Sequence, residues 1–192
     1  SIMADTSPQN ASMHLAKLIQ AELVAVESQG RHKYYRLAGE EIAAAIEAIA
    51  NLVPKSKAGQ AVYEGHDHAM KYCRTCYNHL AGKVGVLVTE SMLRKKIIRK
   101  EPENRYVLTK LGEDFFARLK IELESLKTQR RPLLRPCLDW TERTHHMAGL
   151  LGAAFLNKIL ADDWVRKVAN SRAVIITAKG QKEFYERLEI TV

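Results

Sequence analysis

The stretch Ser7–Leu37, SPQNASMHLAKLIQAELVAVESQGRHKYYRL, predicts a helix followed by a β-hairpin. Ser7 is a favourable N-cap residue, and Pro8 suits the first helical position, where its missing N–H leaves no hydrogen bond unmade. Apolar residues then recur at helical spacing and define one face of the helix: Ala11, Leu15, Leu18 and Ile19.

The opposite face of this helix carries Met13 and a set of polar side chains. This set is unusual, since a face that is merely solvated usually carries Glu and Lys. Gln9 and Asn10 each present a hydrogen-bond donor and an acceptor together, as the edge of adenine requires in the major groove of DNA. We therefore expect this face to contact DNA through Ser7, Gln9, Asn10, Ser12, His14 and Lys17.

Two strand-like segments follow the helix, Leu23–Glu27 and His32–Leu37, with Gly30 in the turn between them. A helix with amide side chains and a hairpin with a basic tip are typical of a winged helix-turn-helix. In that arrangement the helix enters the major groove and the wing contacts phosphates or the minor groove. Arg31 and Lys33, at the tip, are expected to hold phosphates.

The run SPQNASMHLAKL, followed by GRHKYYRLA, resembles the recognition helix and wing of the ArsR/SmtB family of bacterial repressors. The resemblance covers residues 2–53, and its more specific part is the wing, with basic residues before YYRL. It implies a cytoplasmic, homodimeric, DNA-binding repressor that a metal, a metalloid or thiol oxidation releases from its operator. The family usually has Gly between the helix and the wing, where this chain has Glu22.

A complete winged helix has further helices before its recognition helix, so we expect residues 1–53 to form a domain whose first helices precede Ser1. Residues 39–52, GEEIAAAIEAIANL, predict an amphipathic helix. In the resembled family this is a dimerisation helix, on which some members carry Asp and His as metal ligands. The stretch contains neither, so we expect dimerisation but no metal site there. Residues 54–60 predict a linker.

Composition excludes several classes of protein. The chain has 192 residues, of which 46% are hydrophobic and 27% charged, as in soluble globular proteins with one or two cores. The net charge of +8 favours a polyanionic partner such as double-stranded DNA. The sequence shows no apolar run near the ~20 residues that span a bilayer and no signal peptide, so we expect a cytoplasmic protein without a membrane partner. It also lacks the common catalytic motifs, so we expect no enzyme.

The second half, residues 61–192, contains an internal repeat. A long helix is predicted over 61–80, and placing His79 over His146 aligns HLAGKVG with HMAGLLG and IIRK with WVRK. Residues 79–121 and 146–190 each predict a helix, a β-hairpin and a helix. The expected hairpins are Ile97–Lys100 with Arg105–Thr109, and Trp164–Val168 with Arg172–Thr177.

The expected fold is therefore mainly α with small β-hairpins (α+β). It combines a winged helix-turn-helix domain with a C-terminal domain of duplicated helix–hairpin–helix units, which are winged-helix-like. The first helices of these units are too apolar to read bases, so we expect the C-terminal domain to sense a signal or to dimerise.

The three cysteines suggest an inducer site, because three cysteines in a cytosolic protein do not predict a disulfide framework. Thiolate and imidazole ligands would suit a thiophilic metal ion or a metalloid, and paired thiols could instead form a disulfide on oxidation. Nearby Arg74, Arg135 and Arg143 are expected to lower the thiol pKa. The candidate ligands, with Asp139 as a further possibility, are Cys73, Cys76, His79, Cys137 and His146.

Alternatives remain open at this level. The inducer could be a small organic molecule, or there could be no ligand at all, since free cysteines often act as small buried hydrophobic residues. The main hypothesis is a DNA-binding repressor released by an inducer that the C-terminal half senses. Its alternative is a protein-interaction adaptor that uses the winged-helix shape without binding DNA.

Overall fold

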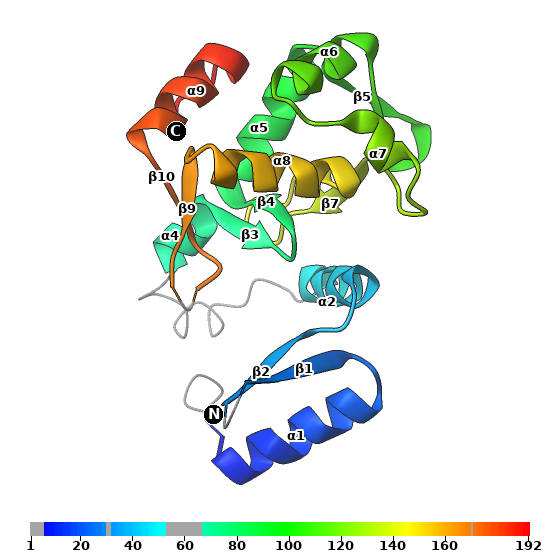
Figure 1. The fold of residues 1–192 in the computed structure, drawn as a ribbon, viewed down its shortest axis with the longest axis vertical. Helices are drawn as coiled ribbons and strands as arrows, with labels where there is room; N and C mark the ends of the chain where they lie inside the picture. Colours follow the sequence, from blue (N-terminus) through cyan, green and yellow to red (C-terminus); the bar gives the residue numbers. More distant parts are fainter. Residues whose placement is uncertain (1–5, 30–31, 53–66, 170) are drawn as a thin grey trace. The chain divides into compact units, whose positions relative to one another are not determined.

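The computed structural model describes residues 6–29, 32–52, 67–169 and 171–192. The chain divides into two compact units, Ser1–Ala50 and Asn51–Val192 (Figure 1). The expected linker at 54–60 and the expected phosphate contact Arg31 lie outside the described residues. Within the described ranges, no helix is long and apolar enough to cross a membrane.

The first unit contains the helix and hairpin that the sequence predicts. Its elements are α1 (Pro8–Gln20), β1 (Val24–Gln29), β2 (His32–Leu37) and α2 (Glu40–Leu52). Ser7 is the N-cap of α1, and its hydroxyl accepts the backbone N–H of Asn10 at 3.2 Å. Strands β1 and β2 pair antiparallel, from Val24 opposite Leu37 to Gln29 opposite His32, and the turn expected at Gly30 lies outside the described residues.

The end of α1 shows how this chain replaces the glycine that usually ends such a helix. Glu22 has a φ of +56°, in the left-handed region. The backbone N–H of Leu23 donates to Leu18 and that of Glu22 to Ile19, both at 2.9 Å, which is the Schellman arrangement. The same ending, with a charged left-handed residue, recurs after three later helices, at Lys96, Lys120 and Asp163. The chain therefore changes direction sharply directly after each of these helices.

The second unit contains short helices and two-stranded antiparallel hairpins. Its elements are α4 (Asp67–Tyr72), β3 (Arg74–Cys76), β4 (His79–Ala81), α5 (Gly82–Arg94), β5 (Ile98–Glu101), the 3-10 turn η2 (Pro102–Asn104), β6 (Arg105–Leu108), α6 (Lys110–Arg118), α7 (Leu123–Lys127), β7 (Arg135–Leu138), β8 (His145–Ala148), α8 (Leu150–Ala161), β9 (Val165–Lys167), β10 (Val174–Ile176) and α9 (Ala178–Leu188). The order hairpin, helix, hairpin, helix occurs twice, from β3 to α6 and from β7 to α9.

The predicted long helix over 61–80 is wrong in its described part. Helix α4 spans only Asp67–Tyr72, and the chain then forms the β3–β4 hairpin. A left-handed Tyr77, with a φ of +53°, makes the turn between these strands and is incompatible with a continuous helix. Cys137 lies in a strand, β7, although the two prolines before it, Pro132 and Pro136, predict an irregular segment. Pro136 is tolerated there because β7 is paired on one side only.

The core of the second unit lies between α5 and α8. Helix α5 packs against β8 and helix α8 against β4, so each helix covers a strand of the other hairpin (Figure 1). Aromatic side chains continue the core in edge-to-face contacts with ring centroids 5.2–6.5 Å apart: Phe115, Phe116, Phe155, Trp164 and Phe184. This exchange of contacts holds β4 and β8 next to one another.

Candidate DNA interface and a cysteine–histidine cluster

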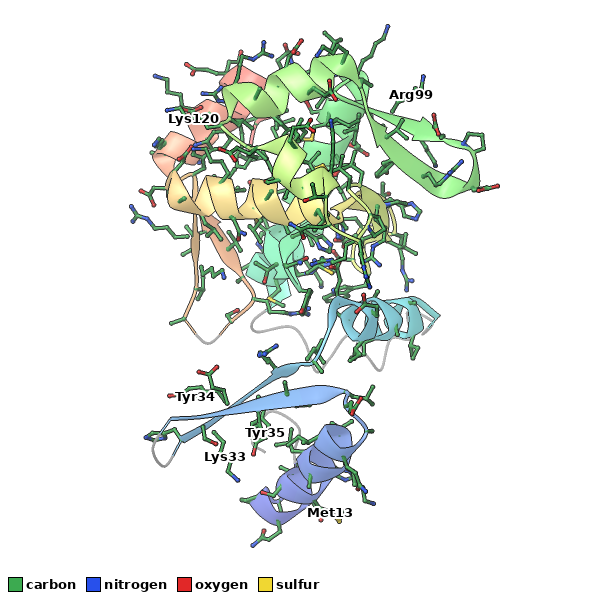
Figure 2. The ribbon with its side chains drawn as sticks, turned by 45° about the vertical axis from the view of Figure 1, so that its right-hand side comes forward. Met13, Lys33, Tyr34, Tyr35, Arg99 and Lys120 are labelled. Carbon is green, nitrogen blue, oxygen red and sulfur yellow. The ribbon has the colours of Figure 1, made fainter. Side chains whose placement is uncertain are left out.

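The polar face of α1 is open to solvent. Within this helix no residue is buried, and only Ala11, Leu15 and Ile19 are half-buried, which marks the side that packs on the hairpin. The polar residues expected to contact DNA are all exposed: Ser7, Gln9, Asn10, Ser12, His14 and Lys17. Met13 lies among them and is 47% exposed (Figure 2).

The wing presents an alternating pattern of side chains. Lys33 and Tyr35 project from the face of the hairpin turned toward α1, whereas Tyr34 projects from the other face (Figure 2). Lys33 is exposed, and the two tyrosine side chains are also exposed. The unit therefore places a cationic side chain and an aromatic hydroxyl on the same side of the wing as the polar helix.

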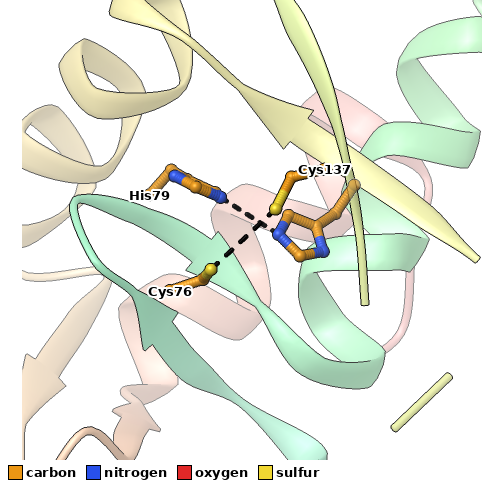
Figure 3. A group of neighbouring side chains, drawn as sticks. Cys76, His79 and Cys137 are labelled. Atoms are coloured by element: carbon orange, nitrogen blue, oxygen red, sulfur yellow. Dashed lines mark hydrogen bonds between the residues drawn. The ribbon is translucent and has the colours of Figure 1, made fainter. Parts of the chain in front are cut away.

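Two hairpins of the second unit bring four sulfur and nitrogen ligands together. Cys76 lies directly opposite His79 in β3–β4, and Cys137 lies directly opposite His146 in β7–β8. The two sulfur atoms are 3.9 Å apart, and the two Nε2 atoms are 3.1 Å apart (Figure 3). The four ligand atoms all lie within 4.8 Å of one another. Four of the five candidate ligands thus form one cluster, which we call the Cys–His cluster.

The fifth candidate, Cys73, is not part of the Cys–His cluster. Its side chain is fully buried in the hydrophobic core, and its backbone carbonyl accepts the N–H of Val174 at 2.9 Å. In the Cys–His cluster, Cys76, His79 and His146 are also buried, whereas Cys137 is half-buried. Access to the Cys–His cluster is therefore from the side of Cys137.

A buried carboxylate, that of Asp139, lies next to the Cys–His cluster. Asp139 follows β7, and its Oδ2 lies 3.2 Å from Nδ1 of His146. Both of its oxygens accept from Nη2 of Arg74 at 2.9 Å, and Oδ2 also accepts the backbone N–H of Gly82 at 2.8 Å. The other histidine has a similar neighbour, because Nδ1 of His79 lies 3.2 Å from Oδ1 of Asn78.

The thiols do not have the low pKa that the neighbouring arginines predicted. The pKa of Cys76 is raised to about 12, first by its hydrogen bond with Cys137 and then by burial. Burial also raises the pKa of Cys73 to about 12, although the charge of Arg74 acts in the lowering direction that the sequence predicts. Arg74 does not act as a partner of a thiolate, because its guanidinium is bound to Asp139. Without a cation, Cys76 therefore remains a protonated thiol.

The two histidines of the Cys–His cluster have opposite shifts. Burial lowers the pKa of His79. Burial would also lower the pKa of His146, but its interactions with Asp139 and Cys76 together outweigh burial and raise this pKa. Burial opposes ionisation of Asp139 as well, yet His146 and Arg74 hold the pKa of its carboxyl far below its usual range. In the absence of another cation, a proton between the rings belongs mainly to His146.

Sequence reasoning missed the residues that support the Cys–His cluster. Arg74 was considered only as a neighbour of thiols, Asp139 only as a possible ligand, and Asn78 not at all. Buried polar partners of this kind leave no periodic signal in a sequence. Two signals pointed to this place, namely the cysteines and the two histidines that the repeat aligns, His79 and His146.

Comparison with known proteins identifies the class of protein. No protein-family model and no solved structure matches the chain. The chain is 39% identical over 190 residues to a Bacillus subtilis (strain 168) protein named as an uncharacterized HTH-type transcriptional regulator, YdfF. This chain belongs to the same family of HTH-type transcriptional regulators. The alignment covers 99% of this regulator and 84% of its relative, so it includes both units described above.

Proposed function

We propose that this regulator binds double-stranded DNA through α1 and the β1–β2 wing. The observation that carries the proposal is the exposure of every polar residue on one face of α1, beside a hairpin with an exposed lysine. Gln9 and Asn10 are assigned to base edges, with Ser12 and His14 beside them. Lys33 is assigned to a phosphate. Membership of an HTH-type family supports the same assignment.

The remaining assignments complete the proposed protein–DNA contact. Ser7 and Lys17, at the two ends of the exposed face, are placed at the phosphate backbone, where hydroxyl and ammonium groups position a protein without reading sequence. Arg31, outside the described residues, belongs to the same set by its place at the tip of the wing. The net charge of +8 supports a polyanionic partner.

The regulator is further proposed to be a homodimeric repressor of the ArsR type. Helix α2 supports dimerisation, because Ile46 and Ile49 lie on its apolar stripe with exposed fractions of 48% and 64%. A pair of large apolar side chains on one exposed helix face is typical of an interaction surface. A dimer would place two α1 helices on successive half-sites of an operator.

The second unit is proposed to receive the signal that releases the repressor. It contains the larger core and the Cys–His cluster, and it has no exposed polar helix face comparable to that of α1 among its described buried helices α5 and α8. These helices have eight and six buried residues and cannot enter a groove of DNA without unfolding the core.

The decisive experiment is a titration of the full chain against a fluorescent duplex from its own promoter and against a shuffled duplex, at several salt concentrations. We expect tighter binding to the promoter, and an association constant that falls linearly on a log–log plot against salt, because bound lysines release counterions. An adaptor that only uses the winged-helix shape would bind neither duplex, and that outcome would overturn the proposal.

A further inference from the structure

We propose that the Cys–His cluster is a tetrahedral binding site for one divalent transition-metal ion of the zinc class. Two thiolates and two imidazoles are the ligand set that such ions select, in preference to the oxygen ligands that Mg²⁺ and Ca²⁺ require. The cluster is separate from the proposed DNA interface, so this inference does not depend on DNA binding.

The sulfur–sulfur and nitrogen–nitrogen distances in the Cys–His cluster match those of a tetrahedron around such an ion. With zinc–sulfur bonds of about 2.3 Å and zinc–nitrogen bonds of about 2.0–2.1 Å, a regular tetrahedron places two sulfurs ~3.8 Å and two nitrogens ~3.3 Å apart. The observed separations are 3.9 Å for Cys76 and Cys137 and 3.1 Å for His79 and His146. The sulfur–nitrogen separations are all within 4.8 Å, so the four ligand atoms are close enough to reach one ion.

The orientation of the two histidine rings is a second, independent observation. Nδ1 of His79 lies 3.2 Å from Oδ1 of Asn78, and Nδ1 of His146 lies 3.2 Å from a carboxylate oxygen of Asp139, although the latter contact lacks the direction of a hydrogen bond. An oxygen beside Nδ1 favours the tautomer that carries its hydrogen there. Both Nε2 atoms then direct lone pairs at one another across 3.1 Å. Two such lone pairs repel unless a cation lies between them. A proton can fill this role in the free protein, and a metal ion fills it for both rings and both sulfurs at once.

The residues behind the histidines have the arrangement that orients metal ligands. A carboxylate or carbonyl oxygen that accepts the distal N–H of a ligating histidine fixes its tautomer and strengthens it as a ligand. Asp139 lies 3.2 Å from Nδ1 of His146 as an ion-pair partner and is itself held by Arg74, Gly82 and Thr141. Asn78 accepts the distal N–H of His79. These are positioning residues, because none of them reaches the centre of the Cys–His cluster.

The symmetry of the Cys–His cluster explains what the ion would do. Each hairpin contributes one cysteine and the histidine directly opposite it, and β4 and β8 lie next to one another. All four positions are filled by protein, so the ion has no open position for a substrate and would act as a clamp between the two hairpins. Metal binding would therefore stabilise the second unit against unfolding.

The test uses the full chain, reduced and stripped of metal with a chelator, and titrated with Co²⁺ as a spectroscopic probe. We expect one ion per chain, with intense ligand-field bands in the visible that mark a tetrahedral site and thiolate-to-cobalt bands in the near ultraviolet. Zn²⁺ should displace Co²⁺ and protect Cys137, the half-buried cysteine of the Cys–His cluster, from alkylation. Circular dichroism establishes that each sample is folded.

Variants assign the ligands. Cys137→Ser should remove about half of the thiolate-to-cobalt intensity, since one of two thiolates is lost. Cys73→Ala is the matched control, because it removes the third cysteine from the core and should leave the bands unchanged. Asn78→Ala keeps all four ligands but removes the partner of His79, and should weaken Co²⁺ binding by ~10–100-fold.

Several outcomes would overturn the metal site. One is a folded wild-type chain that gives no thiolate-to-cobalt bands, or only the weak bands of an octahedral ion. Another is equal loss in Cys73→Ala and Cys137→Ser. A third is that the reduced protein does not bind the metal ion but forms a Cys76–Cys137 disulfide with a mild oxidant. That result would favour a redox switch. Binding of promoter DNA is measured separately, so its failure would count against the proposed function alone.

Discussion

Arg74 and Asp139 form an ion pair from which solvent is completely excluded, with both carboxylate oxygens 2.9 Å from Nη2 of the guanidinium. The pair joins two hairpins, since Arg74 lies in β3 and Asp139 directly follows β7. The guanidinium also lies 4.7 Å from the ring centroid of Trp140 and donates to the carbonyl of Met70 at 3.0 Å. The same carboxylate that orients His146 thus anchors a buried arginine.

This buried pair predicts a large loss of stability when one partner is removed. Asp139→Ala leaves the Arg74 charge buried without its counter-charge, which should lower the free energy of unfolding of the second unit by ~3–5 kcal/mol. The measurement is urea unfolding of metal-free protein, followed by tryptophan fluorescence. Both tryptophans of the chain, Trp140 and Trp164, lie in the second unit and report on it.

An exposed ion pair provides the control for this experiment. Lys182 lies 3.8 Å from Glu186 on α9, and both side chains are largely exposed. Lys182→Ala should change stability far less than Asp139→Ala, because solvent screens such pairs. If both substitutions lowered the free energy of unfolding equally, the buried pair would contribute no more to stability than an exposed pair.

Two glycines predict a second kind of stability loss. Gly112 and Gly180 lie in the first turns of α6 and α9, and a Cβ atom at either would clash with a backbone carbonyl, that of Ile97 or of Trp164. Because backbone must move to relieve the clash, Gly112→Ala and Gly180→Ala should each cost ~1–3 kcal/mol or more. Leu111→Ala, at an exposed neighbour of Gly112, is the control and should have little effect. Urea unfolding measures all three, and stability equal to that of the wild type would contradict the close approach.

The sequence could predict those elements that depend on local signals. The cap at Ser7 and Pro8, the apolar spacing of α1 and the turn at Gly30 identified the first helix and hairpin nearly to the residue. The later hairpins β5–β6 and β9–β10 were also expected, within a residue or two at each end of most strands. The hairpins β3–β4 and β7–β8 were missed, the first because it lies largely within the stretch 61–80, which predicts one long helix. Proline in β7 also argued against a strand.

The Cys–His cluster could be predicted only in part, and for a geometric reason. Cys76 and His79 are three positions apart, whereas Cys137 and His146 are nine apart, because the second hairpin has the longer loop. Aligning the repeat on its histidines therefore does not align the cysteines, and equivalent pairs look unrelated. Cys73 and Cys76 have the i, i+3 spacing that would place both on one face of a helix, but the chain is not helical between them, since α4 ends at Tyr72 and β3 begins at Arg74.

Helix α2 predicts that dimerisation depends on two exposed isoleucines. Replacing Ile46 and Ile49 together by Lys should convert the dimer into monomer, because two charges cannot be buried at an apolar interface without partners. Light scattering of the full chain measures the mass. Glu41→Lys, exposed and outside the apolar stripe, is the control and should remain dimeric. A double variant that stays dimeric would place the interface elsewhere.

The wing predicts a general electrostatic contribution to DNA binding. Lys33→Ala should weaken binding to promoter and shuffled duplexes alike and lower the slope of log affinity against log salt by about one, because one phosphate contact is lost. Lys182→Ala removes the same charge from α9 and is expected to leave the slope unchanged. If Lys33→Ala and the wild type gave equal slopes, Lys33 would not be one of the residues that contact a phosphate.

The exposed amide of Asn10 predicts a sequence-dependent effect instead. If this amide pairs with a base edge, Asn10→Ala should cost ~1–3 kcal/mol on the promoter duplex and much less on the shuffled duplex, because only the specific complex contains that pair. Asn157→Ala removes an exposed amide from α8 and serves as the control. Ser7 binds the backbone of Asn10 and not its side chain, so the substitution leaves the cap of α1 in place. A loss of the same size on both duplexes would mean that Asn10 positions the helix without reading sequence.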